Sequence, residues 1–261
     1  MPDFEILPGL RDHSGAQASH GGHGIDEIIA VIDHLSAAKI PSCVVGVMAL
    51  YYYGAGRITD EWDLCVPDDQ LEAAAGTLLS DGDGAKYEVA KPPPPVPGSL
   101  RHTFRCFQLR GYNFWFLLVP SSDCFVDPSV PEHIESSRNL VPYASLVQFA
   151  RSLLVQQLTA DLADLVDGMD LDVEWGEQHI GFKTLQEASA NFIGLRNRRV
   201  SASGGDDYGR LSPKGMEALW REIASKEEKA KRIEPMKQGR YFTRWRSYKY
   251  PQDPRIRDRP V

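Results

Sequence analysis

Long apolar runs are absent from this 261-residue chain, which excludes one class of protein. No stretch of about 18 consecutive apolar residues occurs, so the sequence predicts no transmembrane helix and no membrane partner. The first residues, MPDFEILPGLRDHSG, lack the basic and apolar regions of a secretory signal. We therefore expect a cytoplasmic protein.

Cysteine is scarce as well. The chain has four cysteines far apart in the sequence, and the first three lie in apolar, strand-like runs: Cys43, Cys65, Cys106 and Cys124. This spacing matches neither a disulfide framework nor a zinc site. We expect small buried thiols in a reducing compartment.

Hydrophobic periodicity is missing from residues 1–24, which are rich in Gly, Ser and His. Such a composition is typical of a flexible arm. His13, His20 and His23 can bind a metal there only loosely, because a structural metal site needs four ligands held in fixed geometry. We expect a solvated leader in this region.

Positive charge is sparse over most of the chain. The net charge is −7, yet the segment from Lys226 to Val261 has twelve basic residues against five acidic ones. The other 225 residues have seventeen basic residues against thirty-one acidic ones. The sequence therefore predicts an acidic body with a basic tail.

The stretch from Cys43 to Val66, CVVGVMALYYYGAGRITDEWDLCV, has the strongest functional pattern. It predicts a strand, a glycine turn, a short aromatic helix, a loop and a second strand. Side chains alternate across a strand, so Glu61 and Asp63 present their carboxylates on one face, while Trp62 points into the core. Magnesium carrying nucleotide phosphates takes one or two carboxylates and keeps several waters. The pair therefore predicts a Mg²⁺ site.

This stretch resembles the nucleotidyltransferase-fold superfamily, in particular its minimal and AbiEii-like members. The residues that match the family pattern are Val44-Val45-Gly46-Val47, Tyr53-Gly54, Arg57-Ile58-Thr59 and Glu61-Trp62-Asp63. The resemblance implies an α+β fold, with a nucleotidyltransferase-like core over residues 25–141 in which helices flank a small mixed sheet. A helical half over 142–200 follows, and then a linker, a charged helix and a basic aromatic tail over 201–261.

The resemblance also implies roles for individual residues. Glu61 and Asp63 would bind the metal and act as the catalytic carboxylates. The nucleotide and its phosphates would be bound by the remaining motif residues, namely Gly46, Val47, Tyr53, Arg57 and Thr59. Two of these roles have alternatives: Arg57 holds a phosphate or pairs with Asp60, and one of Tyr51 to Tyr53 faces the cleft or all three close the helix against its neighbours.

A third metal carboxylate, which most enzymes of this superfamily supply from a later strand, is not visible. No acidic residue occurs between Glu88 and Asp123, and the expected position has Asn113 to Phe116. Asp123 or Asp127 would have to fold back to fill the gap. This absence, together with Val47 where the family has a small residue, favours a degenerate member as an alternative.

The segment from 143 to 167 has leucines at helical spacing, which predicts amphipathic helical structure. Within it, the phrase Asp161-Leu162-Ala163-Asp164-Leu165 resembles a helix that follows the sheet in AbiEii-like proteins. Asp161 and Asp164 would buttress the cleft or lie on a solvated helix face.

Basic and aromatic residues alternate near the end of the chain, a composition that suits single-stranded nucleic acid. The candidate RNA contacts are Arg240, Arg244, Trp245, Arg246 and Lys249. The alternative is a tail that wraps around its own acidic body.

The sequence fits three functions. The first is transfer of a nucleotidyl group from a Mg²⁺-bound nucleoside triphosphate to an acceptor. The second is binding or scaffolding on a degenerate nucleotidyltransferase fold. The third is another transfer reaction on an RNA, such as a tRNA, held by the same cleft and the basic tail.

Overall fold

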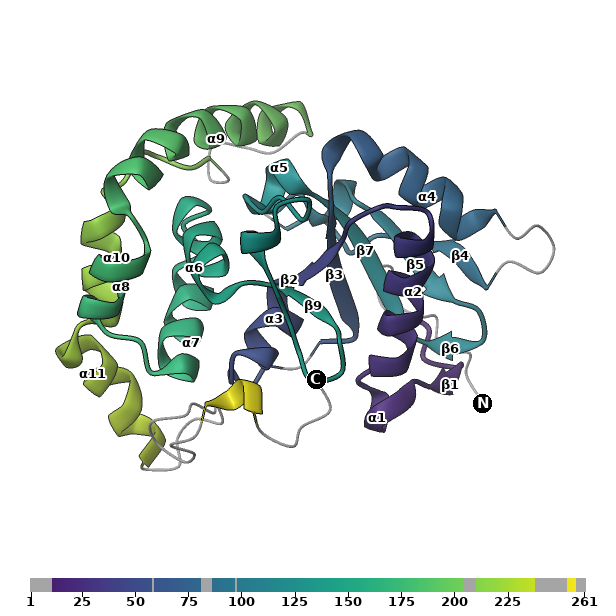
Figure 1. The fold of residues 1–261 in the computed structure, drawn as a ribbon, viewed down its shortest axis with the longest axis horizontal. Helices are drawn as coiled ribbons and strands as arrows, with labels where there is room; N and C mark the ends of the chain where they lie inside the picture. Colours follow the sequence, from purple (N-terminus) through teal and green to yellow (C-terminus); the bar gives the residue numbers. More distant parts are fainter. Residues whose placement is uncertain are drawn as a thin grey trace, which may run out of the picture.

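The computed structural model describes residues 11–57, 59–80, 86–96, 98–203, 210–237 and 253–256. At its centre lies a seven-stranded mixed sheet with the strand order β4-β5-β7-β3-β2-β9-β8, and a second, two-stranded sheet pairs β1 with β6 (Figure 1). The strands are β1 (Ala16–Gln17), β2 (Cys43–Val45), β3 (Glu61–Val66), β4 (Tyr87–Ala90), β5 (Arg105–Leu109), β6 (Tyr112–Asn113), β7 (Trp115–Pro120), β8 (Ile134–Ser136) and β9 (Pro142–Ala144).

Helices flank this sheet, so the predicted class, a small mixed sheet with flanking helices and a helical half, is confirmed. The α-helices are α1 (Ser19–Gly22), α2 (Ile25–Ala37), α3 (Gly46–Tyr52), α4 (Leu71–Leu79), α5 (Ser121–Cys124), α6 (Leu146–Val155), α7 (Thr159–Met169), α8 (Val173–His179), α9 (Phe182–Ala202), α10 (Met216–Ala224) and α11 (Lys226–Lys237). The short 3-10 turns are η1 (Asp68–Gln70), η3 (Arg101–Thr103), η4 (Pro131–His133) and η6 (Pro254–Ile256).

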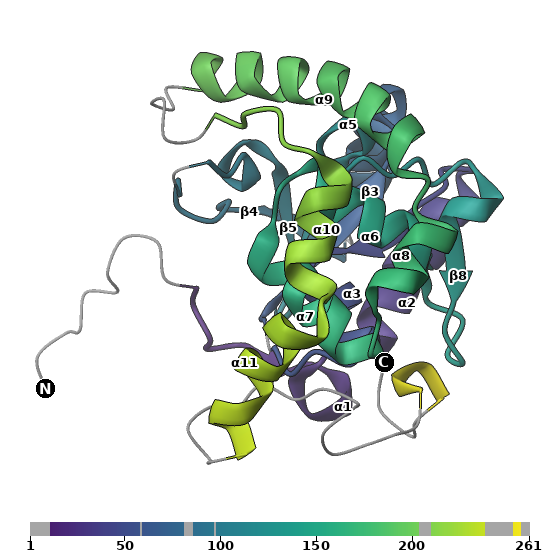
Figure 2. The same ribbon diagram turned by 90° about the vertical axis from the view of Figure 1, so that its left-hand side faces the viewer.

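Strand β3 occupies the middle of the large sheet, antiparallel to β2 and parallel to β7. Its residues from Trp62 to Val66 are all buried, which explains why this segment is an almost continuous apolar run. Helices α2 and α4 pack against each other on one side of the sheet, and α6 to α10 gather on the other side (Figures 1 and 2). The acidic pair therefore lies on the central strand of the large sheet.

Residues 11–24 pack on this sheet, unlike the flexible arm that the sequence predicts. Strand β1 pairs with β6, Ala18 is 5% exposed, and Trp62 Nε1 donates to the His23 carbonyl oxygen at 2.9 Å. The segment has few apolar side chains, and it is held largely by hydrogen bonds of its backbone, which the amino-acid composition does not indicate. Residues 1–10 lie outside the described part of the chain.

The helical half differs from its predicted boundaries at both ends. Residues 142–144 form β9, which pairs with β2 and belongs to the sheet. The helical structure predicted over 143–167 is present as two helices, α6 and α7, which are separated where Gln157 adopts a left-handed conformation with φ of 56°. The linker predicted from residue 201 begins later, since α9 continues to Ala202.

Helix α10 packs back onto α6, α7, α8 and α9, so this part of the predicted C-terminal region belongs to the helical half (Figure 2). Its apolar face includes Trp220, which is fully buried. All four cysteines are free and buried, as expected. In the described part of the chain, none of the helices has both the length and the apolar composition needed to cross a membrane.

Candidate functional site

The acidic pair lies at the start of β3, where the sequence predicts it. In the sheet register Asp63 lies between Val45 of β2 and Leu117 of β7. Asp63 is only 7% exposed, and the Glu61 side chain is 14% exposed. Trp62 points to the opposite face and is buried, as strand alternation requires.

Helix α3 begins directly against Asp63. Gly46, its first residue, has φ of 65°, and a Cβ atom added there would lie 2.2 Å from Asp63 Oδ2. A side chain at this position would therefore collide with the carboxylate. The glycine turn brings the start of α3 into contact with the acidic strand, which requires both a left-handed backbone and the absence of Cβ.

One guanidinium group bridges both carboxylates. Arg101 Nη2 donates to Glu61 Oε2 at 2.8 Å, and Arg101 Nη1 donates to Asp63 Oδ2. Arg11 Nε donates to the other Glu61 oxygen, Oε1, at 2.9 Å. The positive charges of Arg101 and Arg11 thus balance the two carboxylates, and the Arg101 guanidinium group lies between Glu61 and Asp63.

Burial dominates the electrostatics of this cluster. It raises the pKa of Asp63 above its usual range, and Arg101 opposes that rise only in part. Burial alone would lower the pKa of Arg101, but the nearby carboxylates of Asp63 and Glu61 outweigh it and raise that pKa. Asp63 Oδ1 is buried and has no hydrogen-bond partner, which is costly unless a further group binds there.

A cavity of about 410 Å³ opens beside Asp63. Four of the predicted site residues line it, namely Gly46, Val47, Thr59 and Asp63. Its wall also includes five ionisable or polar residues that sequence patterns did not single out for this site: Ser99, Arg101, Ser152, Gln156 and Arg196. Residues from the sheet, from the segment before β5 and from the helical half therefore share one cavity.

The three tyrosines of α3 and its end pack against neighbouring rings. Tyr53 is fully buried, and its hydroxyl donates to the Ala144 carbonyl oxygen at 2.6 Å. Tyr52 stacks on Tyr143, with ring centroids 4.2 Å apart. Tyr51 stacks on a histidine of the N-terminal segment at 5.3 Å. Of the two predicted alternatives, this arrangement corresponds to closure of the helix against its neighbours.

Arg57 is occupied by the helical half. Its Nε lies 2.6 Å from Asp164 Oδ2, and its Nη1 donates to Asp161 Oδ1. Neither predicted partner, a phosphate or Asp60, is needed to explain its position. Asp161 and Asp164 therefore join α7 to the loop before β3, which fits the buttressing role that the sequence indicates for them.

Replacement of Arg57 by methionine is expected to lower the free energy of unfolding by about 1–3 kcal/mol, because it leaves two partly buried carboxylates without their cation. Burial raises the pKa of Asp164, and Arg57 opposes that rise. The ionised form of Asp164 would thus destabilise the folded variant more than the folded wild type. Protonation of Asp164 relieves this effect, so the difference in free energy of unfolding between wild type and variant should decrease as the pH is lowered from about 8 to about 5.

Urea denaturation at both pH values measures this effect. The matched control is Arg110→Met, which removes an exposed pair with Glu88 at 3.4 Å and should cost at most about 1 kcal/mol. Equal losses for the Arg57 and Arg110 variants would contradict the buttressing role.

No third acid joins the pair in the described residues. The strand register places Trp115 beside Glu61 and Leu117 beside Asp63, and the described residues contain no group of three His, Cys, Asp or Glu side chains that could hold a metal ion. Asp123 lines the cavity but pairs with Arg199 at 2.7 Å. The possibility that Asp123 completes a three-acid group is therefore not realised in this structure.

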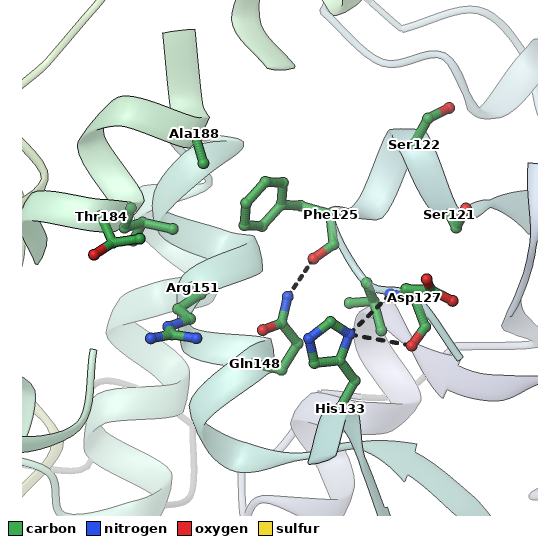
Figure 3. Close-up of a pocket in the computed structure, with 11 residues that line it drawn as sticks. Ser121, Ser122, Phe125, Asp127, His133, Gln148, Arg151, Thr184 and Ala188 are labelled. Atoms are coloured by element: carbon green, nitrogen blue, oxygen red, sulfur yellow. Dashed lines mark hydrogen bonds between the residues drawn. The ribbon is translucent and has the colours of Figure 1, made fainter. Parts of the chain in front are cut away.

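Asp127 lines a second cavity of about 380 Å³, between α5, α6 and α9 (Figure 3). Its backbone N–H donates to His133 Nδ1 at 3.2 Å, and Gln148 Nε2 donates to the Phe125 carbonyl oxygen at 2.5 Å. Arg151, on the same wall, donates through Nε to the Ile180 carbonyl oxygen at 2.8 Å. The polar side chains of His133, Gln148 and Arg151 on the wall of this second cavity thus form hydrogen bonds with backbone groups.

The predicted RNA contacts of the tail lie outside the described residues: Arg240, Arg244, Trp245, Arg246 and Lys249. One short tail segment, 253–256, is described and lies on the body. Pro254 is buried, and Arg255 Nη1 lies 3.2 Å from Glu135 Oε1. At this point the tail contacts its own acidic body, which is the alternative that the charge distribution suggests.

Comparisons of sequence find no match, either to a family model or to a curated protein. Comparison of structures finds similar folds among nucleotidyltransferases. The crystal structure of ANT(2″)-Ia in complex with adenylyl-2″-tobramycin has 10% identity and a TM-score of 0.37, covering 66% of this chain and 97% of that one. A nucleotidyltransferase-like protein from Paracoccidioides brasiliensis has 15% identity and a TM-score of 0.40, covering 72% and 93%. At these identities and TM-scores the similarity carries no conclusion about the activity of this chain.

Proposed function

We propose that this protein binds a Mg²⁺-bound nucleoside triphosphate in the cavity beside Asp63 and transfers its nucleotidyl group to an acceptor. The observation that carries this proposal is the bridge made by Arg101. The Arg101 guanidinium group contacts the carboxylates of both Glu61 and Asp63, which supports a role for the two side chains as joint ligands of one cation, and Asp63 lines the cavity.

The donor set fits magnesium. Carboxylate oxygens are the ligands that this ion prefers, and one or two of them suffice when phosphates and waters complete its shell. Asp63 Oδ1, buried without a partner, is a further available oxygen. Glu61 and Asp63 would hold the ion in place of Arg101, and the ion would neutralise the negative charge of the phosphates.

The other cavity residues would bind the nucleotide. Gly46 and Val47 present backbone close to the acidic strand, and Thr59 presents a hydroxyl group. Arg57 remains a candidate for steadying the leaving group only if it releases Asp161 and Asp164. Arg101, once displaced from the carboxylates, would supply a positive charge to the phosphates from the same wall.

A second candidate function is nucleotide binding without transfer. It is favoured by the register of β7, which places Leu117 beside Asp63 and leaves no carboxylate there to activate an acceptor hydroxyl. The RNA-dependent reaction is the third candidate, and it depends on a tail whose proposed contacts lie outside the described residues.

The test is calorimetric titration of the full chain with ATP, GTP, CTP and UTP, each with magnesium and again with EDTA. Binding that requires magnesium would support the metal site, and pyrophosphate release on adding candidate acceptors would separate transfer from binding. Failure of the folded protein to bind any of the four triphosphates would reject both nucleotide functions.

Removal of the bridging cation should strengthen metal binding. Arg101→Met leaves Glu61 and Asp63 without the charge that bridges them, so we expect Mn²⁺ to bind about tenfold more tightly or better. Electron paramagnetic resonance of free Mn²⁺ measures the affinity without any nucleotide. Arg105→Met, which removes an exposed pair with Glu72, is the matched control. Unchanged Mn²⁺ affinity in the Arg101 variant would show that this arginine does not compete with a metal.

A further inference from the structure

The charged groups of the cavity wall are paired, with one exception. Each carboxylate of the wall has an arginine partner, and these pairs are Asp63 with Arg101, Asp123 with Arg199, and Asp161 with Arg57. Arg196 also lines the wall, but none of the ion pairs found among the described residues involves it. It is a positive charge without a carboxylate of its own.

Arg196 projects from α9 and is only 9% exposed. Its Nη2 donates to the carbonyl oxygen of Gly98, and its Nη1 is buried without a hydrogen-bond partner. Burial lowers the pKa of Arg196, while the nearby Asp123 carboxylate opposes that change. An arginine nevertheless remains protonated in proteins. The structure thus holds a buried charge with an unused donor, which is costly unless an anion binds there.

The local charge favours an anion. Asp123 is matched by Arg199 at 2.7 Å, so Arg196 leaves a net positive charge on the α9 side of the cavity. Asp63 lines the same cavity, and the carboxylates of Asp63 and its neighbour Glu61 are matched by Arg101 and Arg11. A guanidinium group is a strong donor to phosphate oxygens, through two parallel hydrogen bonds where the geometry allows.

We propose that Arg196 is the centre of a phosphate-binding site on the helical side of the cavity, which holds the polyphosphate chain of a nucleotide and binds polyphosphate without a metal. The identification of the natural ligand as a nucleotide rests on the proposed function, but binding of polyphosphate does not. The site also assigns a binding role to the helical half, because Arg196 is the residue of α9 that lines this cavity.

The bond to Gly98 suggests a different role, in which Arg196 only fastens the segment before η3 to α9. Two variants separate these roles. Arg196→Gln removes the charge but keeps an amide that can donate to the Gly98 carbonyl oxygen. Arg198→Met removes a charge from an exposed position of the same helix and is the matched control.

The experiment is calorimetric titration of the full chain with inorganic tripolyphosphate in EDTA. We expect wild type and Arg198→Met to bind equally and Arg196→Gln to bind at least tenfold more weakly, since it loses a charge-assisted contact. Equal affinity of wild type and Arg196→Gln, or no binding to wild type, would overturn the proposal.

If Arg196→Gln does not fold, hydrogen exchange of the wild-type protein tests the site without a variant. Tripolyphosphate should slow exchange in α9 around residues 192–200 and leave α4 unchanged; the absence of protection in α9 would count against the site. Failure of the metal site is distinguishable, because magnesium-dependent triphosphate binding reports on Glu61 and Asp63, whereas binding in EDTA reports on Arg196.

Discussion

Gly46→Ala is expected to destabilise the protein by about 2–5 kcal/mol, although it adds a single methyl group. The left-handed conformation at φ of 65° costs an L-residue about 1–2 kcal/mol. The new Cβ would also lie 2.2 Å from Asp63 Oδ2, and relief of such an overlap in a packed interior costs about 1–3 kcal/mol. Asp63 cannot simply move aside, because it is buried and held by Arg101.

The same chemical change elsewhere should have the opposite effect. Gly76 lies in α4, without positive φ, and a Cβ added there meets no atom within 4 Å. Gly76→Ala should therefore stabilise the protein by about 0.5–1 kcal/mol through helix propensity. Urea denaturation of both variants gives the two free energies of unfolding. If Gly46→Ala were as stable as Gly76→Ala, the turn at Gly46 would not be in close contact with Asp63.

Asp63→Asn should weaken magnesium-dependent binding of nucleoside triphosphate by more than about 100-fold. Outer-shell partners of a metal alone contribute about 10–100-fold to affinity, and Asp63 would be one of only two protein ligands. With Leu117 beside it in the register, no neighbouring carboxylate can replace the lost charge. Binding of tripolyphosphate in EDTA, which depends on Arg196, should be retained.

The matched control is Asp60→Asn, which removes a carboxylate from an exposed position three residues before Asp63. It should bind Mg²⁺-nucleotide like the wild type, and circular dichroism should show both variants folded. Magnesium-dependent binding that survives in Asp63→Asn would remove the acidic pair from the metal site. Loss of binding in this variant, combined with no pyrophosphate release by wild type with any acceptor, would favour a nucleotide-binding protein over a transferase.

Local patterns in the sequence determined the elements that form the acidic strand and its turn. A strand alternates its side chains with a period of two, so Glu61 and Asp63 share a face and Trp62 turns inward, as observed. The lack of acids between Glu88 and Asp123 likewise determined that β5 and β7 contribute none to the site.

Only the tertiary structure decided which charged groups meet. Arg101 reaches Asp63 across 38 positions, Arg11 reaches Glu61 across 50, and Arg57 reaches Asp161 across 104. Local sequence periodicity does not predict ion pairs between residues so far apart, because these pairs depend on the order of the strands in the sheet and on the packing of the helices. For the same reason the sequence does not distinguish Arg196 from other helical arginines; only the packing of α9 against α6 and α10 leaves its side chain buried at the cavity.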